Sequence, residues 1–155
     1  REQGGDLTEM RASEDGVPAE FHQTTWATTR AIEFIDGHSG DEPWMLNINV
    51  YDPHPPFIPP RVYADQFDPT EMPGSHFLES DLQQQAKLRA VDFQDDIRTP
   101  DEHDAFRRQA CYYAMIAQID DQLARILAYL DEHNLRENTV VIFTSDHGES
   151  LGITD

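Results

Sequence analysis

The sequence predicts an α/β fold with parallel strands. Residues 139–144 read Thr-Val-Val-Ile-Phe-Thr, a run of apolar or β-branched residues without alternation. Such a run is typical of a strand buried on both faces of a parallel sheet. Another strand, the first in chain order, is predicted over residues 45–50, and helical patterns precede and separate the two runs. Together these observations indicate a partial α/β layer.

The first part of the chain is expected to contribute little to this layer. Residues 1–20 are polar, contain Gly4, Gly5 and Gly16, and lack periodic apolar residues, which predicts a loop or disordered segment. A partial α/β domain is expected over residues 21–155. It begins with a helix over residues 24–36 that Gly37 ends. The expected apolar stripe of this helix consists of Trp26, Ala27, Ala31, Phe34 and Ile35.

Two more helices are predicted before the second strand. Residues 61–80 carry Pro69, Pro73 and Gly74 and are expected to form an ordered excursion with little regular structure. Asp81 can cap a helix over residues 82–93. The longest helix is expected to start at the Thr99-Pro100 cap. Its expected apolar stripe consists of Phe106, Tyr113, Ile116, Ile119, Leu123, Ile126, Leu127 and Leu130.

An Asp-His pair follows the second predicted strand. Ligands of open α/β sheets collect at the carboxyl ends of strands, which is where Asp146 and His147 stand. A carboxylate and an imidazole can bind a divalent cation, and Gly148 lets the chain turn away. The alternative is turn chemistry, with Asp146 capping the next segment beside an exposed histidine.

The first predicted strand leads into a proline-rich loop. His54 has a proline on each side, and each proline restricts both its own φ and the residue before it. The imidazole is therefore expected on a stiff, extended loop that could bind a ligand. The alternative is a linker in which His54 covers an apolar edge together with Phe57.

The remaining polar residues have simpler expected roles. Asp120 and Asp121 are adjacent on a helix, do not face each other, and are expected to be solvated or to act in capping. The other histidines have no ligand-like spacing and are expected at the surface or at helix ends. They are His22, His38, His76, His103 and His133.

Three segments, taken in order, resemble the type I sulfatase family of the alkaline phosphatase superfamily. They are DPHPPF at residues 52–57, YYAMIAQIDDQL at 112–123 and FTSDHGESLG at 143–152. The resemblance extends over most of the chain from about Phe21 onward. It implies part of a three-layer α/β/α alkaline-phosphatase-like sandwich, and hydrolysis of sulfuric esters by the full-length enzyme.

The resemblance also implies roles for three residues. Asp146 and His147 match two metal ligands, and His54 matches the catalytic histidine that binds the sulfate group. The family's metal is calcium, whereas the imidazole of His147 would also suit manganese or zinc. The family's formylglycine nucleophile comes from a Cys/Ser-x-Pro-x-Arg motif, and the sequence contains no such motif. Cys111 lies within a predicted helix and does not match it.

The length of the chain and its lack of a targeting signal fit a piece of a larger enzyme, and this piece is expected to be inactive alone. The chain has 155 residues, the size of one ordinary domain. It contains neither an apolar run long enough to cross a membrane nor a signal-peptide pattern, so no membrane partner is expected. A periplasmic or secreted location is implied by the resemblance alone. A single cysteine excludes an internal disulfide.

The charge balance excludes one class of partner. Asp and Glu number 30 against 11 Lys and Arg, and the formal net charge is −19. Because lysine and arginine supply most of the affinity for nucleic acid, nucleic acid is not an expected partner. A phosphonate or phosphate ester hydrolase and a non-catalytic acidic binding module remain alternatives to the sulfatase. Exposed strand edges predict self-association as a homodimer.

Overall fold

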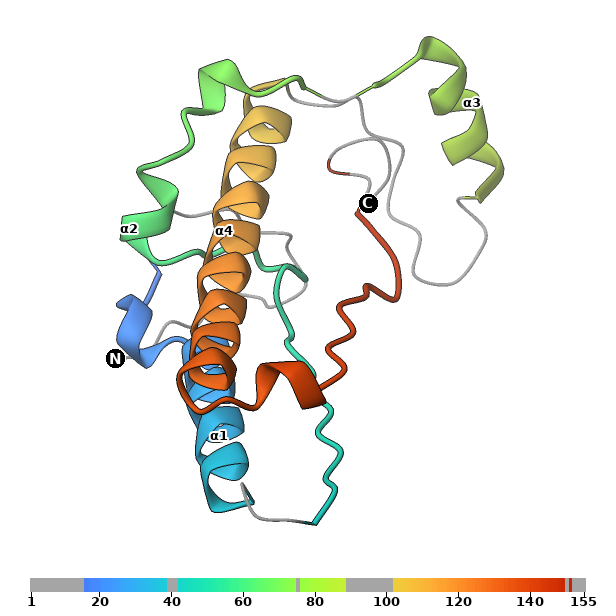
Figure 1. The fold of residues 1–155 in the computed structure, drawn as a ribbon. Coiled ribbons are helices and arrows are strands. Elements are labelled where there is room, and N and C mark those ends of the chain that lie inside the picture. The colour runs from blue at the N-terminus through green and yellow to red at the C-terminus, as the bar shows by residue number, and fades with distance from the viewer. Residues whose placement is uncertain (1–15, 39–41, 75, 89–101, 150, 152–155) are drawn as a thin grey trace, which may run out of the picture.

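The computed structural model describes residues 16–38, 42–74, 76–88, 102–149 and 151. A long helix, α4 (Glu102–Glu132), forms the axis of the molecule, with α1 (Gln23–Gly37) and α2 (Arg61–Ala64) packed against it (Figure 1). The remaining elements are η1 (Ala19–Phe21), η2 (Pro69–Glu71), α3 (Glu79–Leu88) and η3 (Arg136–Asn138).

Helix α1 confirms the helix predicted over residues 24–36, but its buried face differs from the predicted stripe. The buried residues are Thr24, Thr28, Ala31 and Ile35, spaced by three or four along one face. Trp26 is 64% exposed, so its place in the predicted stripe is wrong. Short side chains on this face let α1 approach α4 closely, whereas Trp26 lies two residues away from Thr24 and Thr28, outside that face.

The predicted apolar stripe of α4 is also partly wrong. Tyr113 and Ile116 are 36% and 41% exposed, while Leu130 is buried as predicted. The buried face is made mostly of small and amide residues, which pack toward neighbouring helices. It consists of Ala105, Gln109, Ala110, Cys111, Ala114, Met115, Gln118, Gln122 and Leu130. Asp120 and Asp121 are exposed, as predicted.

Hydrogen bonds join α1 and α4 along their length. Gln118 Nε2 donates to Thr25 Oγ1 at 3.4 Å, and Arg125 Nη2 donates to Thr29 Oγ1 at 3.5 Å. At the far end the Tyr129 hydroxyl donates to Asp36 Oδ1 at 2.7 Å. The short Tyr129–Asp36 bond therefore ties the last turn of α1 to the end of α4.

The Tyr129–Asp36 bond predicts a measurable pH effect. The hydrogen bond to Asp36, burial and the Asp36 charge raise the pKa of Tyr129 above the usual 10.0. Because the protonated phenol is favoured in the folded state, the bond stabilises fully below the unfolded pKa and is lost as pH rises through the higher folded pKa. We expect Asp36→Asn to lower the pH at which phenolate absorbance of Tyr129 appears. Comparison with Tyr129→Phe identifies the part of the absorbance change that comes from Tyr129. An unchanged titration in Asp36→Asn would contradict the hydrogen bond to Asp36 as the cause of the raised pKa.

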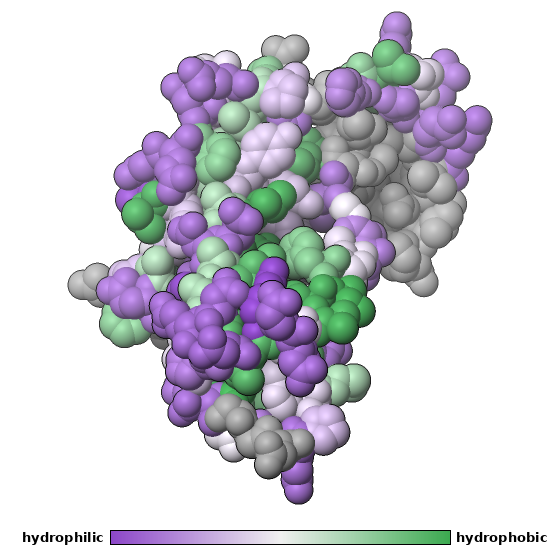
Figure 2. All heavy atoms as spheres, in the orientation of Figure 1, coloured by the Kyte–Doolittle hydropathy of each residue, from purple (hydrophilic) through white to green (hydrophobic). Residues whose placement is uncertain are grey.

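The two predicted strands are extended segments without strand pairing among the residues that the structure describes. Residues 43–51 and 139–145 have no helical or ladder structure, and both run in the same direction in Figure 1. Met45, Val140 and Ile142 are 89%, 87% and 82% exposed, and Figure 2 shows apolar surface on this side of the molecule. The parallel sheet therefore stays a prediction.

The excursion predicted over residues 61–80 contains more regular structure than predicted, namely α2 and η2. Gly74 has φ +77 and lies against the Phe106 ring, where a Cβ would come within 2.9 Å of that side chain. Its N–H donates to Gln109 Oε1 at 3.0 Å, which anchors the excursion on α4. Asp81 lies inside the first turn of α3 and accepts from Leu78 N at 2.8 Å.

Several predictions concern residues outside the described ranges. These are the loop over residues 1–15, the end of the helix predicted to residue 93 and the Thr99-Pro100 cap. At the end of the predicted loop 1–20, η1 (Ala19–Phe21) forms a short 3-10 turn. No helix among the described residues is long and apolar enough to cross a membrane.

Candidate active site

His54 lies exposed on a loop that directly follows the first extended segment. Its backbone N–H donates to Tyr51 O at 3.1 Å, and its ring lies 4.7 Å from the Tyr51 ring, centre to centre. His54 Nδ1 lies 2.7 Å from Pro55 O, and the Tyr51 hydroxyl donates to the same carbonyl at 3.0 Å. A protonated Nδ1 donating to Pro55 O leaves Nε2 as the ring nitrogen for a ligand.

Asp146 and His147 lie on a turn after the second extended segment. Their side chains are 91% and 68% exposed. Asp146 Oδ1 accepts from His147 N at 3.0 Å, and His147 Nδ1 lies 2.8 Å from Gly148 O. The hydrogen bond to Gly148 and the negative charge of Asp146 raise the pKa of His147.

The two side chains fit a shared divalent cation. His147 Nε2 lies 4.0 Å from Asp146 Oδ2, less than twice a typical metal–ligand distance of about 2.1–2.4 Å. The Gly148 carbonyl holds Nδ1, which orients the ring and leaves the lone pair of Nε2 for a metal. Among the described residues no group of three or more His, Cys, Asp or Glu is placed to hold an ion. The described part of the chain therefore offers two candidate ligands, Asp146 and His147.

Both loops are anchored on the same part of α4. Phe57, three residues after His54, is 1% exposed and forms a core cluster with Cys111 and Met115, against which Leu151 and Tyr112 pack. The rings of Phe57 and Tyr112 meet edge to face at 5.9 Å. Phe57 of the His54 loop and Leu151, four residues after His147, therefore meet on one cluster of α4.

Glu149 gives a second sign of this convergence. Burial, followed by the charge of Glu149, raises the pKa of the Tyr112 phenol. Glu149 stands two residues after His147, and Tyr112 contacts the Phe57 end of the other loop. Glu149, in the segment after the Asp-His pair, thus lies near enough to Tyr112 for its charge to act on the phenol, and Tyr112 packs on Phe57 of the His54 loop.

The sequence reasoning missed a buried polar cluster next to His54. Asp52, with a side chain only 1% exposed, lies 3.4 Å from His22 Nδ1 and accepts the Thr24 hydroxyl. His22 is indeed at a helix end, as predicted, but it is buried rather than at the surface. The only local signal was that His22 and Thr24, two polar residues, stand at the start of a predicted helix. The carboxylate that binds them is 28 residues from Thr24 in sequence, and no local pattern pairs them.

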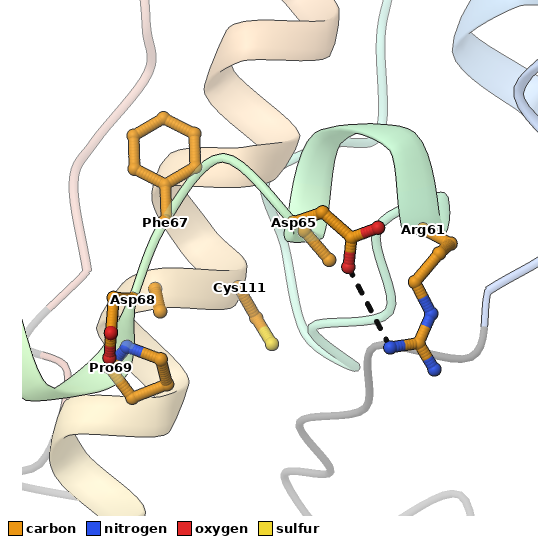
Figure 3. A pocket seen from close by; sticks show the side chains of 8 residues that line it. Arg61, Asp65, Phe67, Asp68, Pro69 and Cys111 are labelled. Atoms are coloured by element: carbon orange, nitrogen blue, oxygen red, sulfur yellow. Dashed lines mark ion pairs between the residues drawn. The ribbon is translucent and has the colours of Figure 1, made fainter.

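A hollow of about 420 Å³ lies elsewhere, between α4, α2 and η2. It is lined by Arg61, Ala64, Asp65, Phe67, Asp68, Pro69, Ala110 and Cys111. Figure 3 shows Cys111 on α4 and the 3.7 Å ion pair between Arg61 and Asp65. His54, Asp146 and His147 are not among its lining residues, and Cys111 is buried within α4. This hollow is separate from the candidate active site.

The described fold is similar to that of a known hydrolase. The crystal structure of phosphonate monoester hydrolase of Agrobacterium radiobacter matches with a TM-score of 0.76 and 27% identity. The match covers 96% of this chain and 32% of that chain. The three-dimensional arrangement therefore belongs with hydrolases of the alkaline-phosphatase-like fold.

The sequence comparison is more specific. The family model described as Sulfatase matches residues 4–154, so the chain belongs to the sulfatase family. The "Multifunctional alkaline phosphatase superfamily protein PehA" of Trinickia caryophylli is 35% identical over 150 residues, covering 88% of this chain and 29% of that protein. An arylsulfatase of Clostridium perfringens is 28% identical over 137 residues, covering 88% of this chain and 28% of that protein. The chain thus spans less than a third of the length of these relatives.

Proposed function

We propose that this chain forms part of the active site of a metal-dependent hydrolase of sulfuric esters. The observation that carries the proposal is that Phe57 of the His54 loop and Leu151, four residues after His147, meet in the cluster with Cys111 and Met115. Membership of the sulfatase family and the arylsulfatase relative support the reaction class. We further propose that residues 45–50 and 139–144 belong to the parallel sheet of an α/β/α sandwich.

The chain's own residues would divide the work as follows. Asp146 and His147 would hold the divalent cation, with calcium favoured and manganese or zinc as alternatives. Such a cation would stabilise the negative charge on the ester oxygens. His54, when protonated, would donate from Nε2 to a sulfate oxygen or to the leaving oxygen. The nucleophile, a formylglycine in the family that the motifs resemble, would come from residues outside this sequence.

A second candidate function has its own support. The solved structure with 27% identity is a phosphonate monoester hydrolase, and PehA is described as multifunctional. Sulfate and phosphonate esters share a tetrahedral centre with charged oxygens and demand nearly the same pocket. We therefore propose phosphonate or phosphate ester hydrolysis as the alternative activity of the same site.

An assay of the full-length protein tests the proposal. The substrates are a 4-nitrophenyl sulfate, a 4-nitrophenyl phenylphosphonate and a 4-nitrophenyl phosphate, each with calcium, manganese or zinc. We expect metal-dependent release of nitrophenol with the highest kcat/KM for the sulfate. A preference for the phosphonate would support the second function. Failure to hydrolyse all three with any metal would favour a non-catalytic binding module.

The 155-residue chain alone is expected to be catalytically silent and to bind metal weakly. Two ligands leave most of the coordination shell to water, and the sequence lacks the nucleophile motif. The same substrates and metals provide the measurement, with His54→Ala as the control for contaminating activity. Metal-dependent turnover well above that control would show that the nucleophile lies within this chain and that the role assignment is wrong.

The chain is also expected to form a homodimer. Ile142 and Phe143 are 82% and 68% exposed on an extended segment, and unpaired extended backbone favours pairing with another chain. The net charge of −19 opposes association, and added salt screens this repulsion. Sedimentation equilibrium across a salt series should show dimerisation that strengthens with salt. A monomer at every salt concentration would contradict this prediction.

A further inference from the structure

The buried carboxylate of Asp52, two residues before His54, binds residues at the start of α1. The side chain of Asp52 is 1% exposed, and its Oδ2 accepts the hydroxyl of Thr24. Its Oδ1 accepts from Gln23 Nε2 at 3.3 Å, and His22 Nδ1 lies 3.4 Å from Oδ2. Burying an ionised group without such partners is strongly unfavourable. The partners from α1 therefore hold Asp52 in this position.

The cluster holds Asp52 in either state of the His22 ring. Thr24 N lies 3.4 Å from His22 Nδ1 and donates to it when that nitrogen is unprotonated. When Nδ1 is protonated, it can donate to Asp52 instead. In both cases the carboxylate keeps the Thr24 hydroxyl and the Gln23 amide. The N-terminus of a 15-residue helix also favours a nearby negative charge.

The loop that carries His54 is consequently held at both ends. Asp52 is fixed to α1 on one side, and Phe57 is fixed in the core cluster of α4 on the other. The residues between them include three prolines, each of which restricts φ. His54 itself is exposed, so its position depends on these two anchors more than on its own contacts.

We propose that Asp52 is a positioning residue that sets the place of the His54 imidazole in the reaction. The inference rests on the proposed function of His54. Misplacement of a reacting group by about 1 Å can reduce the rate about 100-fold. Loss of the contacts between Asp52 and α1 therefore lowers kcat because the His54 imidazole is displaced, while parts of the protein distant from the loop keep their structure.

The first test compares three variants and a matched control of the full-length protein in the ester hydrolysis assay. Asp52→Asn removes the charge, and Thr24→Val removes the hydroxyl donor while keeping the shape. We expect each to lower kcat about 10- to 100-fold with a nearly unchanged KM, and Thr24→Ser to restore most of the loss. The matched control is Asp68→Asn, because Asp68 makes a similar but exposed pair with Thr70. Wild-type kcat in Asp52→Asn would overturn the proposal.

The second test asks whether Asp52 acts through His54. In a His54→Ala background, Asp52→Asn should lower kcat no further, because the group that it positions is already absent. A purely structural role would lower kcat by the same factor in both backgrounds, which would overturn the proposal. If His54→Ala alone leaves kcat unchanged, the proposed function of His54 is wrong. If His54→Ala lowers kcat but Asp52→Asn does not, only the positioning role of Asp52 is wrong, so the two failures can be told apart.

A readout independent of activity completes the design. Amide hydrogen exchange of the peptide spanning residues 51–58 should accelerate in Asp52→Asn and stay at the wild-type rate in Asp68→Asn. The amide of His54 bonds to Tyr51 O within this peptide and reports the loop directly. Unchanged exchange in Asp52→Asn would show that the carboxylate does not hold the loop, and would overturn the proposal.

Discussion

Replacing His54 by alanine is expected to lower kcat of the full-length hydrolase by about 100- to 10,000-fold. Proton transfer or hydrogen bonding by a positioned side chain contributes a factor of this size. The ring is set up for the role, since Nδ1 is engaged by Pro55 O at 2.7 Å. The remaining nitrogen, Nε2, is therefore the one proposed to meet the substrate. Steady-state kinetics with an aryl sulfate provide the measurement.

The leaving group separates the two roles considered for His54. If Nε2 protonates the leaving oxygen, His54→Ala should impair esters of weakly acidic phenols more than the 4-nitrophenyl ester. If it binds a sulfate oxygen, the loss should be similar for all esters, and His54→Gln should recover part of it. The control is His133→Ala, because His133 Nδ1 makes a comparable contact of 2.8 Å to Tyr129 O. Equal kinetics for wild-type and His54→Ala would remove His54 from the site.

Removing the carboxylate of Asp146 is expected to abolish most metal binding and activity. Asp146 Oδ2 and His147 Nε2 lie 4.0 Å apart on one exposed turn and are proposed to share the cation. Changes to groups that only support metal ligands reduce affinity or activity about 10- to 100-fold, and loss of a ligand should exceed this. Metal content of the purified full-length protein and kcat/KM at rising metal concentration provide the measurements.

The matched control for Asp146→Asn is Asp120→Asn. Asp120 is an exposed carboxylate on α4, so the substitution changes the net charge equally without touching the Asp146–His147 pair. We expect Asp146→Asn to regain part of its activity at high metal concentration, because an amide oxygen is a weaker ligand than a carboxylate. Wild-type metal content and activity in Asp146→Asn would contradict the ligand assignment.

Local patterns accounted for helix α1 and for the placement of the motifs after extended segments. Periodicity and Gly37 predicted the helix that forms α1, and the proline-flanked His54 does lie on a loop after an extended segment. These features depend on neighbours in sequence, which is why single-sequence reasoning reached them. The shared role of His54, Asp146 and His147 stays a prediction.

The buried faces of the helices were less accessible to this reasoning. In α4 the apolar pattern pointed to Tyr113 and Ile116, yet the residues buried against other helices include Gln118 and Ala114. A helix with apolar residues around much of its circumference leaves the choice of face to its partners. Packing against α1 and α2 favours short side chains and amides that can donate across the contact, as Gln118 Nε2 does to Thr25.

The sequence alone indicated which chemical groups follow each extended segment, because those groups are adjacent to the segments along the chain. It did not reveal that Asp52 is bound to the start of α1, nor that Phe57 and Leu151 meet on the same cluster of α4. Such contacts join residues that are far apart in sequence and form when whole elements pack together. Burial of the Asp52 carboxylate then requires its donors from α1, a condition that arises in the folded molecule.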